Sequence, residues 1–330
     1  RHLRLRTYLL KDQQHETVSN GVSTTNDYSA IVPAIDPSLM VQDISQLNDE
    51  RKLLDFKGYS VYYAAWDEIP NIRQEIGRLR EITFREVAEG TGKESDLDSY
   101  DRHYKHLFIW NNEKEEIVGA YRFGEVKQIL ASKGIKGLYT HEFYQFSDSA
   151  LEKFEHGLEM GRSFVRKEYQ RSPYSLLLLW KGICEYVYRN EDSYYLFGAV
   201  SVSDNYDERS RFLIAQLLTE QDSDIKAKRH YKPQFKMSRE VNKICKNYHC
   251  DELNEISSLV RSIEEDGKDI PVLVKQYHKL GGKLAAFVVD EGFGSTLDGL
   301  ISVDLRKTEH KYLKMYMGKK AQPFLDRYVS

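Results

Sequence analysis

Cysteine is scarce in this chain of 330 residues, which contains only Cys184, Cys245 and Cys250. So small and odd a number excludes a disulfide framework and predicts a reducing compartment, for which we take the cytoplasm. No run approaches the roughly 18 apolar residues of a membrane-spanning helix, so any membrane contact is expected to be peripheral. An excess of basic charge is also lacking, since 48 basic and 51 acidic side chains give a net charge of -3. Nucleic acid is therefore not expected as a partner.

A metal site is not predicted either. Cys245, His249 and Cys250 are residue types that bind metals, but their spacing lacks a fourth partner and matches no standard zinc pattern. The glycines at 281–282 and 292–294 fit a helix end and a hairpin turn better than a phosphate-binding loop. We therefore expect no metal and no permanently bound cofactor.

Two parts of the chain differ in composition. Residues 11–40 are polar with little periodicity, so we expect residues 1–57 to be an N-terminal arm or linker with a short charged helix over 47–54. Residues 58–330 are expected to form one domain, because 41% of the chain is hydrophobic and can supply a core. A charged region at about 222–268 interrupts the pattern and is expected to be an inserted segment with local helices.

Within 58–330, hydrophobic periodicity predicts alternating strands and helices. Strands are expected over 59–65, 106–110, 117–123, 158–165, 194–202, 283–289 and 297–305. Helices are expected over 70–90, 174–189, 206–220 and 270–280, followed by a closing helix. The apolar run 176–180 and Phe164 belong to a buried core or, less readily, to an acyl tunnel.

Charged residues of both signs recur on these elements in a way that suggests one cleft. The set comprises Arg80, Asp98, Asp101, Arg122, Glu159 and Arg162. If their strands are neighbours, the arginines can orient the carboxylates and hold them ionised. The alternative is a group of ordinary surface pairs, which contribute little to stability.

Four of these segments, in this order, resemble a known signature. They are Gly77 to Arg85, Asp98 to Asp101, Ile117 to Arg122, and Glu159 to Val165. Together with the 277–305 segment they resemble the GNAT branch that contains the acyl-homoserine-lactone synthases and the ornithine-lipid and glycine-lipid N-acyltransferases, often labelled hemolysins. The resemblance spans roughly residues 58–305. It implies an α+β fold with α/β/α layers, in which a mixed twisted sheet with flanking helices splays around the strand that bears Glu159.

The resemblance also implies a reaction, the transfer of a long-chain acyl group, 3-hydroxylated in some relatives, from a thioester to the amine of glycine or ornithine. Glu159 is then the expected base, with a simple salt bridge to Arg162 as the alternative. Tyr206 is the expected proton donor to the thiolate, with a packed aromatic as the alternative. The charged cluster with Phe84 is expected to bind substrate, so the substrate-binding set is Arg80, Phe84, Asp98, Asp101, Arg122 and Arg162.

The donor is inferred from a departure from the family pattern. Enzymes of this fold that use acetyl-CoA usually carry a glycine-rich turn for the pyrophosphate, whereas the stretch 170–175 here has no glycine. Acyl-carrier protein therefore fits better than coenzyme A, and Arg166, Lys167 and Arg171 suit an acidic carrier. A solvated basic turn is the alternative. The expected donor-binding residues are Ser163, Phe164, Val165, Arg171, Ser172 and Tyr174.

The start of the chain and two rival functions complete the expectations. The chain begins at Arg1 and opens with an arginine-rich segment that resembles the tail of an O-acyltransferase domain, so we expect the C-terminal unit of a two-domain acyltransferase; no His-x4-Asp motif is present. One rival is a signal synthase of the acyl-homoserine-lactone type. The other is a non-enzymatic, membrane-active or lipid-binding protein of the hemolysin type. A lipid-forming enzyme would contact the inner membrane peripherally.

Overall fold

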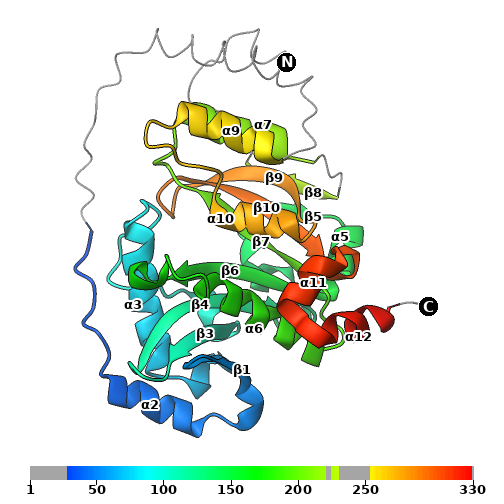
Figure 1. Cartoon of the computed structure of the whole chain (residues 1–330). Coiled ribbons are helices and arrows are strands. Elements are labelled where there is room, and N and C mark those ends of the chain that lie inside the picture. The colour runs from blue at the N-terminus through cyan, green and yellow to red at the C-terminus, as the bar shows by residue number, and fades with distance from the viewer. Residues whose placement is uncertain (1–27, 221–223, 230–252, 329–330) are drawn as a thin grey trace, which may run out of the picture.

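The computed structural model describes residues 28–220, 224–229 and 253–328, and its centre is a mixed sheet (Figure 1). Eight strands follow the order β1-β2-β3-β4-β6-β7-β10-β9, and β5 pairs separately with β8. Only the β6–β7 pairing is parallel; the other neighbouring strands of the described chain are antiparallel. The strands are β1 (Lys52–Phe56), β2 (Tyr59–Ala65), β3 (Lys105–Asn111), β4 (Glu116–Glu125), β5 (Tyr144–Phe146), β6 (Gly157–Val165), β7 (Tyr195–Val202), β8 (Ile225–Ala227), β9 (Lys283–Asp290) and β10 (Thr296–Asp304).

Helices cover both faces of this sheet, which gives three layers (Figure 1). They are α2 (Pro37–Gln46), α3 (Ile72–Arg85), α4 (Val126–Lys133), α5 (Asp148–Glu155), α6 (Ser175–Arg189), α7 (Glu208–Leu218), α9 (Leu253–Ile263), α10 (Val272–Lys279), α11 (His310–Met317) and α12 (Ala321–Asp326). One face packs against α6, α10 and α11, and the other against α3, α4 and α5. The expected α/β/α layering is therefore confirmed.

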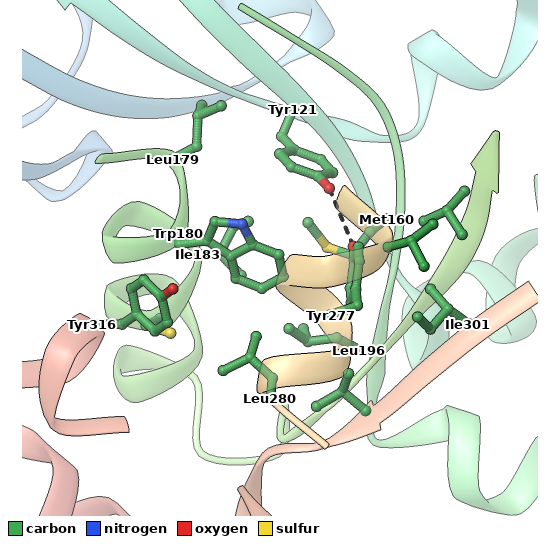
Figure 2. Packing of buried hydrophobic residues seen from close by; sticks show 14 of the residues in the cluster. Tyr121, Met160, Leu179, Trp180, Ile183, Leu196, Tyr277, Leu280, Ile301 and Tyr316 are labelled. Atoms are coloured by element: carbon green, nitrogen blue, oxygen red, sulfur yellow. Dashed lines mark hydrogen bonds between the residues drawn. The ribbon is translucent and has the colours of Figure 1, made fainter. Parts of the chain in front are cut away.

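The larger core lies under α6 and α10 (Figure 2). Trp180 of α6 is fully buried, and its ring meets that of Tyr277 of α10 edge to face at a centroid distance of 5.0 Å. Leu178 and Leu179 are buried beside it. Burial of such side chains contributes about 1.5–3 kcal/mol each, so the apolar run of α6 serves as core. Phe164 lies on the other face, in the cluster around α3.

Helix α3 begins where a distant carboxylate satisfies its free backbone donors. Asp43 of α2 is buried, and its Oδ2 accepts the N–H groups of Asn71 and Ile72 at 2.8 and 2.9 Å. A helix start leaves four N–H groups without partners inside the helix, so this contact fixes both the start of α3 and the place of α2. The arm and the domain are thus joined at this point.

The strands and helices expected within 58–330 are present, with shifts of a few residues at their ends. The helix expected over 47–54 is wrong: a single 3-10 turn, Asp49–Arg51, leads into β1, which pairs with β2. The folded unit therefore begins before residue 58, because β1 is an edge strand of the sheet. In the expected insertion, β8 and α9 are formed, whereas 221–223 and 230–252, with Cys245, His249 and Cys250, lie outside the described residues.

Strands β6 and β7 pair over only three residues and then part. The last pair is Glu159 with Phe197. Immediately beyond it, a Cβ atom on Gly198 would lie 2.0 Å from the carbonyl oxygen of Met160, so only glycine fits where the strands come closest. Past Gly198 the strands diverge, and the space between them forms the site described next.

Candidate active site

An inner cleft of about 110 Å³ lies between the parted strands. Its walls are residues 160–163 of β6 and 199–201 of β7. Further lining side chains come from elements far apart in the sequence: Phe84, Glu89, Tyr121, Arg122, Tyr139, Leu273, Tyr277, Phe293 and Asp298. The cleft therefore passes from the α6 and α10 side of the sheet to the α3 side, and both layers of helices contribute to it.

An outer cleft of about 240 Å³ adjoins it on the α3 side. The loop 91–100 supplies most of its wall, and Glu142 and Asp290 add two carboxylates. Tyr139, Arg162 and Phe293 line both clefts, so these three side chains form the partition between them.

Arg162 occupies an unusual backbone position at this partition. Its φ is +51°, in a bulge where β6 carries one residue more than β4. The guanidinium lies over the rings of Tyr139 and Phe293, 5.1 and 4.5 Å from their centroids. Its Nε is buried without a hydrogen-bond partner among the described residues. The bulge thus aims a cation between two aromatic rings, where its Nε pairs with Asp96 at 3.4 Å without a hydrogen bond.

The charged cluster expected from the sequence is formed behind the partition. Arg80 Nε and Nη1 donate to Asp96 and Asp101 at 3.0 and 2.8 Å, and Arg122 Nη1 donates to Asp98 at 2.7 Å. Sequence reasoning missed Asp96, which also lies 3.4 Å from Arg162. Arg80, Asp101 and Arg122 are each at most 2% exposed, so they form a buried network instead of solvated surface pairs.

Charges within the network decide which groups are ionised. Burial works to raise the pKa of Asp101, but the neighbouring Arg80 and Arg122 guanidiniums outweigh it and hold that pKa well below its usual range. Burial lowers the pKa of His106, which contacts Asp101, to about 4. The network therefore contains a firmly ionised carboxylate and a neutral imidazole at neutral pH. This arrangement braces β3, β4 and α3 around the clefts.

Glu159 does not line either cleft, contrary to expectation. It is 1% exposed and points away from Met160, whose side chain lines the inner cleft. Its carboxylate accepts the N–H groups of Tyr139 and Thr140 at 3.1 and 2.6 Å and the hydroxyl of Tyr104. Burial raises its pKa. Glu159 fixes the turn that carries Tyr139, and so lies one layer behind the cleft.

Tyr206 is not a lining residue of the inner cleft either, although it lies near Glu89. Its hydroxyl donates to the carbonyl oxygen of Asp269 at 2.7 Å, and its ring packs at the edge of the larger core. Two other phenols, Tyr121 of β4 and Tyr277 of α10, line the cleft, with their hydroxyl oxygens 3.2 Å apart (Figure 2). Periodicity alone cannot single these two out among 23 tyrosines.

Two carboxylates of the inner cleft were also missed, Glu89 and Asp298. Glu89 follows α3, and its Oε2 accepts the hydroxyl of Ser201 of β7 at 3.0 Å. Asp298 of β10 is 4% exposed and accepts the hydroxyl of Thr296 at 2.9 Å. Burial raises the pKa of each to about 7, and for Asp298 the nearby Asp290 adds to the rise. In sequence, each is an unremarkable acid in a loop or a strand.

The structure does not bring the expected donor-binding residues together in one place. Ser163 lines the inner cleft, whereas Phe164 is buried in the core against α3 and does not. Val165 pairs with Gly119 in the sheet. The turn before α6 carries Arg171, which is exposed, with Ser172 and Tyr174 partly buried beside it. Phe84 lines the inner cleft, where its ring meets Phe293 edge to face at 5.1 Å.

Comparison with known proteins shows the family to which the chain belongs. Residues 79–181 match the model of the acetyltransferase (GNAT) domain. The chain is 30% identical to a glycine N(alpha)-acyltransferase of Phocaeicola vulgatus, over 80% of this chain and 85% of that protein. The chain belongs to the GNAT-fold N-acyltransferase family. This acyltransferase is also 28% identical to an L-ornithine N(alpha)-acyltransferase of Brucella abortus, over 78% of this chain and 90% of that one.

Among solved structures, the acyltransferase is similar to a CoA-dependent acyl-homoserine lactone synthase, with a TM-score of 0.39 and 11% identity over 82% of this chain and 89% of that chain. In residues 28–220, 224–229 and 253–328, no group of three or more histidine, cysteine, aspartate or glutamate side chains is arranged to hold a metal ion. Those same residues include no helix long and apolar enough to cross a bilayer.

Proposed function

We propose that this N-acyltransferase joins a long-chain acyl group, including 3-hydroxyacyl groups, to the α-amine of a small amino acid such as glycine or ornithine. The observation that carries the proposal is the inner cleft between β6 and β7, where polar groups of both signs face a gap in the sheet. The names of the relatives from Phocaeicola and Brucella support an amino-acid acceptor.

The chemistry requires a thioester carbonyl and an amine to meet in that gap. The amine, stripped of one proton, attacks the carbonyl; the tetrahedral intermediate then expels a thiolate, and the amide nitrogen loses its second proton. Groups that orient the two reactants supply much of the rate, because holding them in place removes the entropy cost of their meeting. Arg162, Tyr139 and Phe293, at the partition, are suited to that task. The cluster of Arg80, Asp98, Asp101 and Arg122 acts behind them by holding this wall in place.

We further propose acyl-carrier protein as the donor, with acyl-CoA as a weaker substitute. The glycine-free turn before α6 supports this, because it lacks the backbone cradle for a pyrophosphate. Exposed Lys167 and Arg171 offer an acidic carrier a basic surface. We place the reaction in the cytoplasm, as the scarcity of cysteine suggests. Because the product is a lipid, we also propose peripheral contact with the inner membrane.

The test is a direct assay of the purified chain. It is incubated with 3-hydroxyacyl carrier protein or the matching acyl-CoA and a panel of amino acids, and products are detected by mass spectrometry. An N-acylated amino acid supports the proposal. A parallel reaction with S-adenosylmethionine as acceptor distinguishes a signal synthase, which would release an acyl-homoserine lactone. If no amine is acylated from either donor, the proposed function is wrong.

A further inference from the structure

The two carboxylates of the inner cleft have no ion-pair partner among the described residues, although the charge of Arg162 works to lower the pKa of both. In the stretches of chain that the structure describes, no ion pair joins Glu89 or Asp298 to a lysine, arginine or histidine. Each accepts one neutral hydrogen bond, from Ser201 and Thr296 respectively. Buried carboxylates in proteins are normally paired, because desolvating an isolated charge is costly. Two unpaired ones that share a cleft indicate a place where a cationic ligand completes the charge balance.

The loop that carries Glu89 is held firmly in an uncommon conformation. Ala88, the preceding residue, has a φ of +60°, and its carbonyl oxygen is so close to Gly294 that a Cβ there would lie 2.3 Å away. Ser203, which follows β7, donates its hydroxyl to the carbonyl oxygen of Val87 at 2.5 Å. Strained backbone persists only where its surroundings enforce it, and it concentrates at functional sites. The contacts from β7 and from the β9–β10 turn therefore fix Glu89 at the cleft wall.

A positive charge lines the same cleft. Arg162 lines it together with Glu89 and Asp298, and its Nε makes no hydrogen bond, although Asp96 lies 3.4 Å from it. A small molecule with a carboxylate at one end and an ammonium group at the other matches this distribution of charge. A free α-amino acid is such a molecule, since at neutral pH it is a zwitterion whose two charges lie one carbon apart.

We propose that the inner cleft binds the acceptor amino acid as a zwitterion, with its carboxylate on Arg162 and its ammonium group on Glu89 and Asp298, and that Glu89 takes the proton that frees the amine. This inference rests on the proposed function. An acyl thioester and an ammonium acceptor yield an amide, a thiol and one proton. That proton goes to the Glu89 carboxylate before attack. The second proton lost by the nitrogen neutralises the departing thiolate, so the charges balance.

A carboxylate that is to accept a proton from an ammonium group works best when its pKa lies near the working pH. The pKa of Glu89 and that of Asp298 are both raised to about 7, chiefly by burial. The charged and titratable groups around the pair come from several neighbouring elements: Arg162 of β6, Tyr139, Tyr144 of β5, Asp290 of β9, Arg211 of α7 and Tyr206. Arg162 and Arg211 favour the ionised forms, whereas Asp290 and the mutual repulsion of the pair oppose them.

The experiment compares Glu89→Gln, Asp298→Asn and Arg162→Lys with the wild-type chain. Glu264→Gln is the matched control, because Glu264 is also a buried carboxylate with a raised pKa but lies outside both clefts. Acylation of the preferred amino acid is measured from pH 5.5 to 9, with kcat and KM separated. Hydroxylamine serves as a second acceptor, since it is largely neutral at pH 7 and has no carboxylate. Circular dichroism verifies that each variant is folded.

The wild-type rate should fall as the pH drops below about 7. Glu89→Gln should lower kcat for the amino acid by about 100-fold, the lower end expected for a lost general base, and remove that acid limb. Asp298→Asn, which removes a charge, and Arg162→Lys, which keeps the charge but loses the planar guanidinium donors, should each raise KM for the amino acid by about tenfold or more. All three should lose less activity with hydroxylamine than with the amino acid, and Glu264→Gln should match wild type with both acceptors.

Failure of this inference is separable from failure of the proposed function. If wild type acylates amino acids while Glu89→Gln, Asp298→Asn and Arg162→Lys retain its kcat, KM and pH profile, the zwitterion site is wrong and the function stands. Amino-acid binding, measured by calorimetry without a donor, gives a second readout. If wild type binds glycine or ornithine, the three variants bind it weakly and no acylation occurs, the site stands and the function is wrong. Equal binding by wild type and variants overturns the site.

Discussion

The hydroxyl oxygens of Tyr121 and Tyr277 lie 3.2 Å apart in the wall of the inner cleft. Their contact joins the central strand β4 to helix α10, which are 156 residues apart in the chain. Burial keeps the pKa of Tyr277 well above its usual range, so its hydroxyl remains protonated at neutral pH and can donate to a departing thiolate. Neither residue is distinguished by sequence from the other tyrosines.

Replacing Tyr277 by Phe should lower kcat by up to about tenfold, because a thiol of ordinary pKa, about 8.5, leaves as a thiolate without full proton transfer. Stability should drop by about 1 kcal/mol, since Tyr121 loses its partner. Tyr206→Phe is the comparison: its hydroxyl is bonded to Asp269, so its rate should stay within about twofold of wild type. Steady-state kinetics and urea denaturation measure both. Equal rate losses in the two variants would contradict this assignment.

Asp101→Asn should destabilise the fold by about 3–5 kcal/mol, because it leaves Arg80 and Arg122 buried without their shared carboxylate. The folded-state pKa of Asp101 is held below its unfolded value, so its stabilisation is present above about pH 4 and lost as the pH falls lower. The difference from wild type should therefore shrink in acid. Asp67→Asn, at a 97% exposed side chain, should change stability by less than about 0.5 kcal/mol. Denaturant titrations at pH 7 and pH 3 test both statements.

Asp298 should make the protein less stable as the pH rises. Its folded-state pKa, about 7, lies above its unfolded value of 3.8, so the native state binds the additional proton between these pH values and loses that advantage as pH increases through 7. Asp298→Asn lacks this loss. Relative to that of wild type, the free energy of unfolding of the variant should therefore rise by about 2 kcal/mol between pH 5 and pH 8. The same substitution type at exposed Glu152, to Gln, should give no such gain. Urea denaturation at the two pH values decides.

Arg171→Glu should raise KM for acyl-carrier protein by about tenfold while changing that for acyl-CoA by less than about threefold, because the side chain is exposed on the turn before α6 and steers an acidic surface. The effect should diminish as salt is raised, since screening weakens contacts between exposed charges. Lys133→Glu, an exposed charge reversal on α4, should leave both values unchanged. If Arg171→Glu instead impairs acyl-CoA as strongly as the carrier protein, the basic turn binds the phosphates they share.

Sequence patterns predicted the elements whose periodicity is strong. Helix α6 and strands β6 and β7 follow from their own apolar spacing, and the ordered motifs predicted that Arg80, Asp98, Asp101, Arg122 and Arg162 come together. Strand β1 was missed because its charged residues favour a helix locally, and only pairing with β2 makes it a strand. Tertiary pairing overrides local propensity in such edge strands.

The functional assignments depended on which face of a strand each side chain occupies and on how deeply it is buried. Which face of β6 bears Glu159 is set by the register with β4 and β7, and motif order does not reveal it. Glu89 and Asp298 acquire their raised pKa chiefly from burial, which arises when α3, β7 and β10 are assembled. The order of motifs in a sequence does not reveal which carboxyl groups will be buried, and burial is what raises these pKa values.

The brief β6–β7 pairing also has a mechanical consequence. Five strands on one side and three on the other are joined along the sheet by only three residue pairs, next to a glycine that tolerates no side chain. Such a seam is the natural place for the sheet to flex, because few backbone hydrogen bonds cross it. A molecule held between β6 and β7 would act as a brace across the two plates, so occupancy of the gap and rigidity of the whole enzyme should rise together.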